Sequence, residues 1–216
     1  HFVRVRGGHR GLVVTVGERG EHALLEWLRR HLPAPGPDVV VGIGDDAAVI
    51  DTSSPTWWHL TTDLLAEGIH FDMKSATPES VGYRAAMANL SDIAAMGAVP
   101  RYLLISLAIP KTWTRPHIHE LYTGLMKACR LYDVTLVGGD TSASKAGLFL
   151  SITLVGATSR RLALFRHGAN VGDHIYVSGT LGDSLAGLTL LMGHTGSGPS
   201  RKRKSEFSGT HRAFLL

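Results

Sequence analysis

The sequence predicts an α+β fold in which a mixed β-sheet carries helices on one face. Two observations lead to this prediction. Apolar segments with strand spacing outnumber those with helical spacing, and the expected order is a helix, three strands, a helix, a strand, a helix and two strands rather than a strict alternation. In addition, 44% of the 216 residues are hydrophobic, which is enough to build a substantial core.

Three helices are predicted in the first part of the chain. One at about 19–32 carries apolar residues at helical spacing and stops at Pro33. A second at about 78–96 follows Thr77, a residue suited to the N-cap, and begins with a proline. A third at about 116–132 has a regular amphipathic stripe. We expect strands at 38–44, 47–51, 56–65, 101–109, 134–140 and 148–158.

A second unit follows these elements. Its first strand is predicted at 172–179 and its first helix at 181–193, after which turn formers and a basic run replace any periodicity. The expected parts are an N-terminal extension at 1–14, a first domain at 15–160, the start of a second α/β domain at 161–194 and a disordered basic tail at 195–216.

The net charge of +4 does not indicate a nucleic-acid-binding protein, because the excess of basic residues lies at the two ends of the chain. Residues 21–194 contain 13 Lys/Arg and 16 Asp/Glu, so this body is slightly acidic and needs a cationic partner for its clustered carboxylates. No apolar stretch is long enough to span a membrane. The single cysteine, Cys129, excludes an internal disulfide and fits the reducing cytoplasm, where we expect the protein to work.

Several aspartates stand in unusual places. Asp45 and Asp46 are adjacent between two predicted strands, where they either form a hairpin turn or have their repulsion relieved by a cation. Asp63 interrupts an apolar strand directly after Thr61 and Thr62. It either faces solvent from an edge strand, or these three residues offer oxygen ligands to neighbouring Mg²⁺ ions.

Asp92 lies in a helix that is apolar nearly all round and is therefore expected to be buried. An isolated buried carboxylate costs on the order of several kcal/mol. It must protonate, pair with a cation or bind a metal, and Arg84, two turns back, is the alternative partner. The small residues beside Asp92 leave room for a ligand to approach.

Three further residues complete the candidate set. Asp140 follows two glycines at a strand end, a place where backbone N–H groups can approach a phosphate, although a plain turn explains the same residues. Arg166 is either a phosphate clamp or a solvated surface arginine, and His70 is by type more often structural. The sequence has neither a Walker loop nor a metal-binding Cys/His array, so a carboxylate-rich Mg²⁺ site for phosphate chemistry remains.

Five segments resemble, in order, the motifs of the thiamine-monophosphate kinase family, whose superfamily includes aminoimidazole ribotide synthetase and selenophosphate synthetase. They are GIGDDAAVI, TTDLLAEGIHF, NLSDIAAMGAVP, VGGDTS and GDHIYVSGTLGDSLAGL. The resemblance runs from about Val16 to Gly193. It implies a PurM-like N-terminal domain that binds ATP and several Mg²⁺ ions at 15–160, and a homodimer formed through the sheet of that domain.

The resemblance also implies roles for single residues. The metal ligands it implies are Asp46, Thr61, Thr62, Asp63, Asp92 and Asp140. His70 is implied as a contact to thiamine monophosphate, and the ATP contacts are Gly139, Asp140, Arg166 and Tyr122, the last of which also belongs to a helix's apolar stripe. The implied reaction is Mg²⁺-assisted in-line transfer from ATP to thiamine monophosphate, whose phosphate oxygen is already ionised and needs no general base.

The family's later S-D-G and G-G-E-D-Y motifs are missing from this sequence. Two alternatives to the kinase therefore stay open at this point. One is a related ATP-using synthetase of the same superfamily, and the other is a non-catalytic Mg–ATP-binding or dimerisation fragment.

Overall fold

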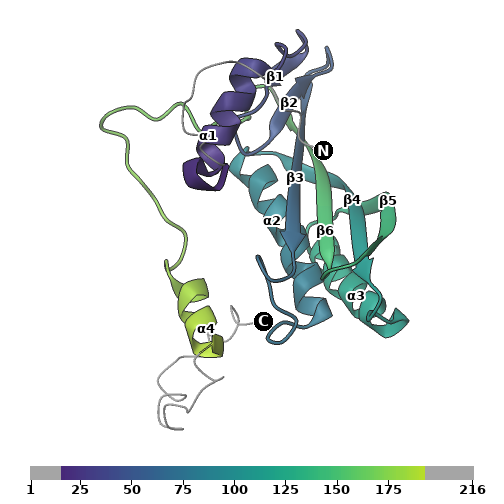
Figure 1. Ribbon diagram of the computed structural model, residues 1–216. Helices are drawn as coiled ribbons and strands as arrows, with labels where there is room; N and C mark the ends of the chain where they lie inside the picture. Colours follow the sequence, from purple (N-terminus) through teal and green to yellow (C-terminus); the bar gives the residue numbers. More distant parts are fainter. Residues whose placement is uncertain (1–15, 193–216) are drawn as a thin grey trace, which may run out of the picture.

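A computed structural model describes residues 16–192 and has the predicted mixed sheet with helices packed on one face (Figure 1). In chain order the elements are α1 (Val16–His31), β1 (Val39–Val41), β2 (Ala48–Asp51), β3 (Thr56–Ala66), α2 (Pro78–Ala95), β4 (Val99–Pro110), α3 (Arg115–Leu131), β5 (Thr135–Ser144), β6 (Phe149–Ser159) and α4 (Asp183–Met192). The predicted regions 1–14 and 195–216 lie outside the described residues.

The six strands form one sheet in the order β1-β2-β3-β6-β4-β5. β4 and β5 are parallel, whereas every other neighbouring pair is antiparallel, so the sheet is mixed as predicted. The long strand β3 lies inside the sheet between β2 and β6, and β5 forms an edge. The alternative that Asp63 faces solvent from an edge strand is therefore wrong.

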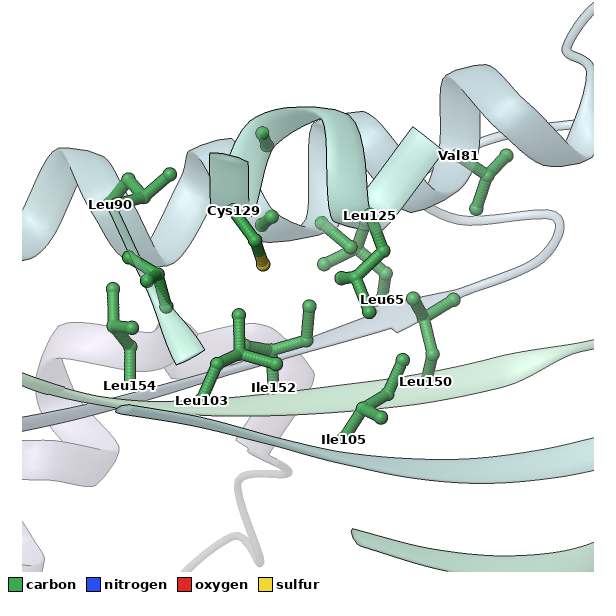
Figure 2. Close-up of a cluster of buried hydrophobic side chains, with 14 of the residues drawn as sticks. Leu65, Val81, Leu90, Leu103, Ile105, Leu125, Cys129, Leu150, Ile152 and Leu154 are labelled. Carbon is green, nitrogen blue, oxygen red and sulfur yellow. The ribbon is translucent and has the colours of Figure 1, made fainter. Parts of the chain in front are cut away.

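α2 contacts β3, β6 and β4, and α3 packs against α2. Figure 2 shows the core between these helices and the sheet, with Leu103, Ile105 and Ile152 pointing up from the strands. Cys129 of α3 is buried there, and burial raises the pKa of its thiol, which agrees with a structural rather than a reactive role.

The ends of α2 follow the sequence prediction closely. Thr77 Oγ1 accepts a hydrogen bond from Ser80 N at 3.1 Å, while Thr77 N donates to Ser80 Oγ at 3.0 Å, so a capping box closes the N-terminus. At the other end Gly97 adopts a φ of 66°, a conformation that glycine takes without strain. These local signals fix where the site-bearing helix begins and ends.

Three predictions of extent are wrong. β1 stops at Val41 instead of continuing to residue 44, because Gly44 turns the chain with a φ of 127°. β5 continues to Ser144 because its polar end pairs with β4. Residues 172–179 form no strand, since their apolar side chains, including Ile175 at 93% exposure, have no neighbouring strand in the described part of the chain. The helix predicted after them is present as α4.

Candidate active site

The inward face of β3 carries the residues at the centre of the candidate site. Alternation along the strand turns Thr61 and Asp63 toward α2, and Thr61 is buried. Thr61 Oγ1 donates a hydrogen bond of 2.6 Å to Asp92 Oδ2, which ties the strand to the helix. Residues 31 positions apart in the sequence therefore meet.

Asp63 and Asp92 form a pair of half-buried carboxylates. Burial raises the pKa of Asp63, and the charge of Asp92 raises it further. Burial also raises the pKa of Asp92, although the hydrogen bond from Thr61 acts in the opposite direction. Arg84 does not neutralise Asp92 as the alternative supposed, because its guanidinium donates to the carbonyl oxygen of His70 at 2.7 Å. The pair is thus a place where a cation would remove an electrostatic cost.

Asp45 and Asp46 lie in the turn before β2 and face Arg166. The Asp46 amide donates to Asp45 Oδ1 at 2.9 Å. Asp45 therefore shapes the turn, as the hairpin-turn alternative predicted. The Arg166 amide donates to Asp45 Oδ2 at 3.2 Å, and its guanidinium binds the Asp46 carboxylate through Nε and Nη2. That bond raises the pKa of Arg166 above its ordinary value.

Arg166 is brought there by the segment that follows β6. Leu164 N donates to the carbonyl oxygen of Met96 at 3.0 Å, and the ring of Phe165 lies 6.5 Å from that of Trp57. The charges of Asp46 and Arg166 both act on Asp92. One connected group therefore contains Asp46, Thr61, Asp63, Asp92 and Arg166.

Thr62 lies on the opposite face of the sheet from this group. Its Oγ1 donates to the carbonyl oxygen of Ile152 at 3.0 Å, and the hydroxyls of Ser151 and Thr153 lie within 3.3 Å of it. The side chain is engaged with β6, and the structure does not bring it next to the carboxylate pair.

Tyr122, Gly139 and Asp140 line a separate cavity of about 380 Å³ between α3 and the edge strand β5. A Cβ on Gly139 would lie 1.8 Å from the carbonyl oxygen of Ile105, so the two strands approach too closely there for any side chain. Tyr122 both lines this cavity and packs on the core, and burial raises the pKa of its phenol. Both of its predicted roles are compatible with this position.

The two groups of residues lie apart in this chain. β6 and β4 separate β3 from β5, so three strand spacings, roughly 14 Å, lie between Asp63 and Asp140. Accordingly, no set of three or more His, Cys, Asp or Glu side chains within residues 16–192 gathers closely enough to hold a metal ion. The carboxylate pair nevertheless fits Mg²⁺, which usually takes one or two protein carboxylates and completes its shell with waters and substrate phosphates.

His70 lies in the loop after β3, near Asp63. Its Nδ1 accepts a hydrogen bond from Ala66 N at 3.0 Å, so the neutral ring carries its proton on Nε2. The side chain is exposed, and it lies close enough to Asp63 that a positive charge on the ring would lower the pKa of Asp63. An exposed Nε2–H donor beside the carboxylate pair could bind a phosphate oxygen.

Sequence reasoning missed two polar residues at this contact. His59 precedes Thr61 on the same face of β3, and Asn89 precedes Asp92 by one helical turn on α2; both are fully buried. Neither stood out, because a histidine in a strand and an asparagine in a helix are ordinary without knowledge of burial.

A family model described as AIR synthase related protein, N-terminal domain, matches residues 44–158, a stretch that includes the carboxylate pair. The chain belongs to this family. Its curated relatives are thiamine-monophosphate kinases, as the five motifs predicted. The Bacillus subtilis (strain 168) enzyme is 37% identical over 174 residues, and the Aquifex aeolicus (strain VF5) enzyme is 41% identical over 175 residues. In both cases the alignment covers 81% of this chain and 54% of the relative, so the chain spans about half the length of the curated relatives it matches.

Solved structures agree. AaThiL complexed with AMPPCP and TMP is 36% identical, with a TM-score of 0.78, and the match covers 95% of this chain and 60% of that chain. Thiamine monophosphate kinase from Aquifex aeolicus gives 34% identity and a TM-score of 0.68, covering 89% and 58%. E. coli HypE, a hydrogenase maturation protein, shares the fold at 22% identity and a TM-score of 0.54, covering 78% of this chain and 54% of that chain.

Proposed function

We propose that this chain is the metal- and ATP-binding part of a kinase that phosphorylates thiamine monophosphate to thiamine diphosphate with ATP. The observation that carries the proposal is the half-buried pair formed by Asp63 of β3 and Asp92 of α2. The hydrogen bond from Thr61 to Asp92 joins these two elements. Its support is the similarity to a structure that was solved with AMPPCP and TMP. On this proposal, residues 15–160 are the ATP- and Mg²⁺-binding domain and residues 161–194 begin the second domain.

Asp63 and Asp92 would hold Mg²⁺, with Asp46 and the hydroxyl of Thr61 beside them. Mg²⁺ bound there would neutralise phosphate charge that otherwise keeps two polyanionic substrates apart. Thr62 and Asp140 remain proposed ligands of further ions, although they lie outside this group.

The chain's own residues orient the two substrates. The Nε2–H of His70 would donate to the phosphate of thiamine monophosphate, and Arg166, released from Asp46, would bind a phosphate of ATP. Gly139 and Asp140 would accept the nucleotide in the cavity beside Tyr122. The acceptor oxygen is ionised near neutral pH, so no residue needs to remove a proton, and catalysis rests on positioning and charge.

The test replaces each member of the carboxylate pair by its amide. Asp63→Asn and Asp92→Asn should each weaken Mg–ATP binding in calorimetric titration, while thermal stability is kept or raised because one of two repelling charges is removed. Asp133→Asn, at an exposed position with a φ of 54° that asparagine tolerates, makes the same charge change elsewhere and should alter neither quantity. Unchanged affinity in both site variants would refute the metal assignment.

A second candidate function is a non-catalytic Mg–ATP-binding fragment. It is favoured by the division of the predicted ligands into two groups that lie on different strands of the sheet. A related synthetase has no such support. Thiamine diphosphate formation by the purified chain, followed by chromatography, separates the candidates: product above background supports the kinase, and Mg–ATP binding without product supports the fragment.

We also propose a homodimer through the sheet face opposite α2 and α3. That face exposes apolar side chains on β3 and β4, the two strands that flank β6, among them Leu60 at 39%, Leu64 at 59% and Leu104 at 39%. Leu104→Lys should convert dimer to monomer in light scattering, whereas Leu131→Lys on α3, 65% exposed, should not. A wild-type chain that is monomeric at high micromolar concentration would contradict the proposal.

The cytoplasm is the compartment we propose, because the single cysteine is free and buried and ATP is the substrate. No helix within residues 16–192 has the length and apolar character needed to cross a membrane.

A further inference from the structure

The buried polar atoms that lack partners lie on two elements that contact each other, β3 and α2. Within residues 16–192, the buried side-chain atoms without a hydrogen bond are Trp57 Nε1, both ring nitrogens of His59 and Asn89 Oδ1. All belong to β3 or α2, the two elements that carry Asp63 and Asp92. Buried polar groups are almost always hydrogen-bonded, so unpaired atoms on the two elements of the candidate site require an explanation.

Asn89 has a defined orientation. Its side chain is fully buried, and Nδ2 donates to the carbonyl oxygen of Ala85 at 3.2 Å. Turning the amide over would place Oδ1 against that carbonyl oxygen, so the hydrogen bond fixes which atom is which. Oδ1 is therefore an acceptor held in place without a donor.

The position of Asn89 relates it to the carboxylate pair. Asn89 and Asp92 are three residues apart on α2, so they share one face, with Cβ atoms about 5–6 Å apart. α2 also runs against the direction of β3. Asp92 bonds to Thr61, and the next residue, Ile93, lies against Gly156, which pairs with His59.

This direction decides which residue of β3 lies nearest. A step forward along α2 from Asp92 corresponds to a step back along β3, from Thr61 toward His59. A step back along α2, from Asp92 to Asn89, therefore leads from Thr61 toward Asp63. Asn89 thus lies on the Asp63 side of the bond that joins the helix to the strand.

We propose that Asn89 is a positioning residue for the cation site, with Oδ1 accepting a hydrogen bond from a water of the Mg²⁺ held by Asp63 and Asp92. The inference rests on the proposed function. Mg²⁺ bound by one or two carboxylates keeps several waters, and those waters are donors. Residues that hydrogen-bond to the ligands of a metal typically lower the metal affinity about 10- to 100-fold when they are lost.

The test compares variants of similar size by titration with MgCl₂ alone and by thermal unfolding without metal. Asn89→Leu should raise the Kd for Mg²⁺ about tenfold, while the metal-free chain keeps or gains stability because an unpaired buried acceptor is gone. Met87→Leu, on the same helix but away from this face, should change neither quantity.

Asn89→Asp retains an acceptor at the same place and adds a negative charge. It should bind Mg²⁺ at least as tightly as the wild type, and its metal-free form should be less stable. A purely structural asparagine would change stability in these variants without changing Mg²⁺ affinity.

If the wild-type chain binds Mg²⁺ and the Kd of Asn89→Leu lies within twofold of the wild-type Kd, the inference is wrong and the proposed function stands. If Asn89→Leu does not fold, a Kd for Asn89→Asp above that of the wild type overturns it instead. If the wild-type chain binds no Mg²⁺, or if Asp63→Asn binds Mg²⁺ as tightly as the wild type does, the proposed metal site is wrong and this inference fails with it.

Discussion

Gly139→Ala tests the close approach of β4 and β5 at the candidate nucleotide cavity. The added Cβ would lie 1.8 Å from the carbonyl oxygen of Ile105, which is backbone and so has no rotamer with which to move away. Separation to ordinary contact requires more than 1 Å of movement between two hydrogen-bonded strands. Overpacking of this kind costs about 1–3 kcal/mol, and the rigid neighbour argues for the upper end.

The neighbouring glycine provides a matched control. Gly138 has the same φ of 159°, so an alanine at either position carries the same backbone strain, but a Cβ at Gly138 meets only a Leu104 side-chain atom at 3.7 Å, an ordinary contact. At roughly 2–4 °C per kcal/mol, Gly139→Ala should lower Tm by about 5–10 °C relative to Gly138→Ala in calorimetric unfolding. Equal Tm values for the two variants would refute the reasoning, since only the steric clash distinguishes them.

Two further predictions concern charge. Burial lowers the pKa of His59 in the folded chain. As pH falls, the unfolded chain therefore takes up this proton at a higher pH than the folded chain does, and the free energy of unfolding should fall as pH drops below about 6.5. His59→Leu should remove that part of the fall in thermal unfolding at pH 7.5 and 5.5; an identical pH dependence would contradict it. Arg166→Met should tighten binding of Mg²⁺ alone, because Asp46 loses a competing cation, and weaken ATP binding. Titration with Mg²⁺ alone and with ATP alone measures the two affinities. A loss of affinity for both ligands would refute the idea that Arg166 competes with Mg²⁺ for Asp46.

The elements that the sequence predicted well are those with local signals. Thr77 and the proline after it set the start of α2, and Gly97 follows its end, because capping depends on residues within one turn. β5 was predicted too short because its last residues are polar and owe their conformation to pairing with β4. The segment 172–179 was predicted as a strand from its apolar residues, yet a strand needs a neighbour, and periodicity carries no information about one.

The site divides in the same way. The sequence could mark Asp63 and Asp92 as costly, because an aspartate in an apolar strand or helix is anomalous wherever the chain folds. It could not say that Thr61 would bond Asp92, since that contact joins residues 31 positions apart through the packing of α2 on β3.

Arg166 illustrates the same limit from the other side. Seen along the chain, Arg166 and Asp46 are two separate candidates, one for ATP and one for a metal. In the fold they bind each other, although they lie 120 positions apart in the sequence. Arg166 neutralises the carboxylate that a metal would need, and Asp46 neutralises the guanidinium that a phosphate would need. Their roles are therefore coupled: Asp46 becomes free for a cation only when Arg166 finds another anion, and a phosphate of ATP is the anion that the proposed function supplies. Metal and nucleotide should consequently bind more tightly together than either does alone.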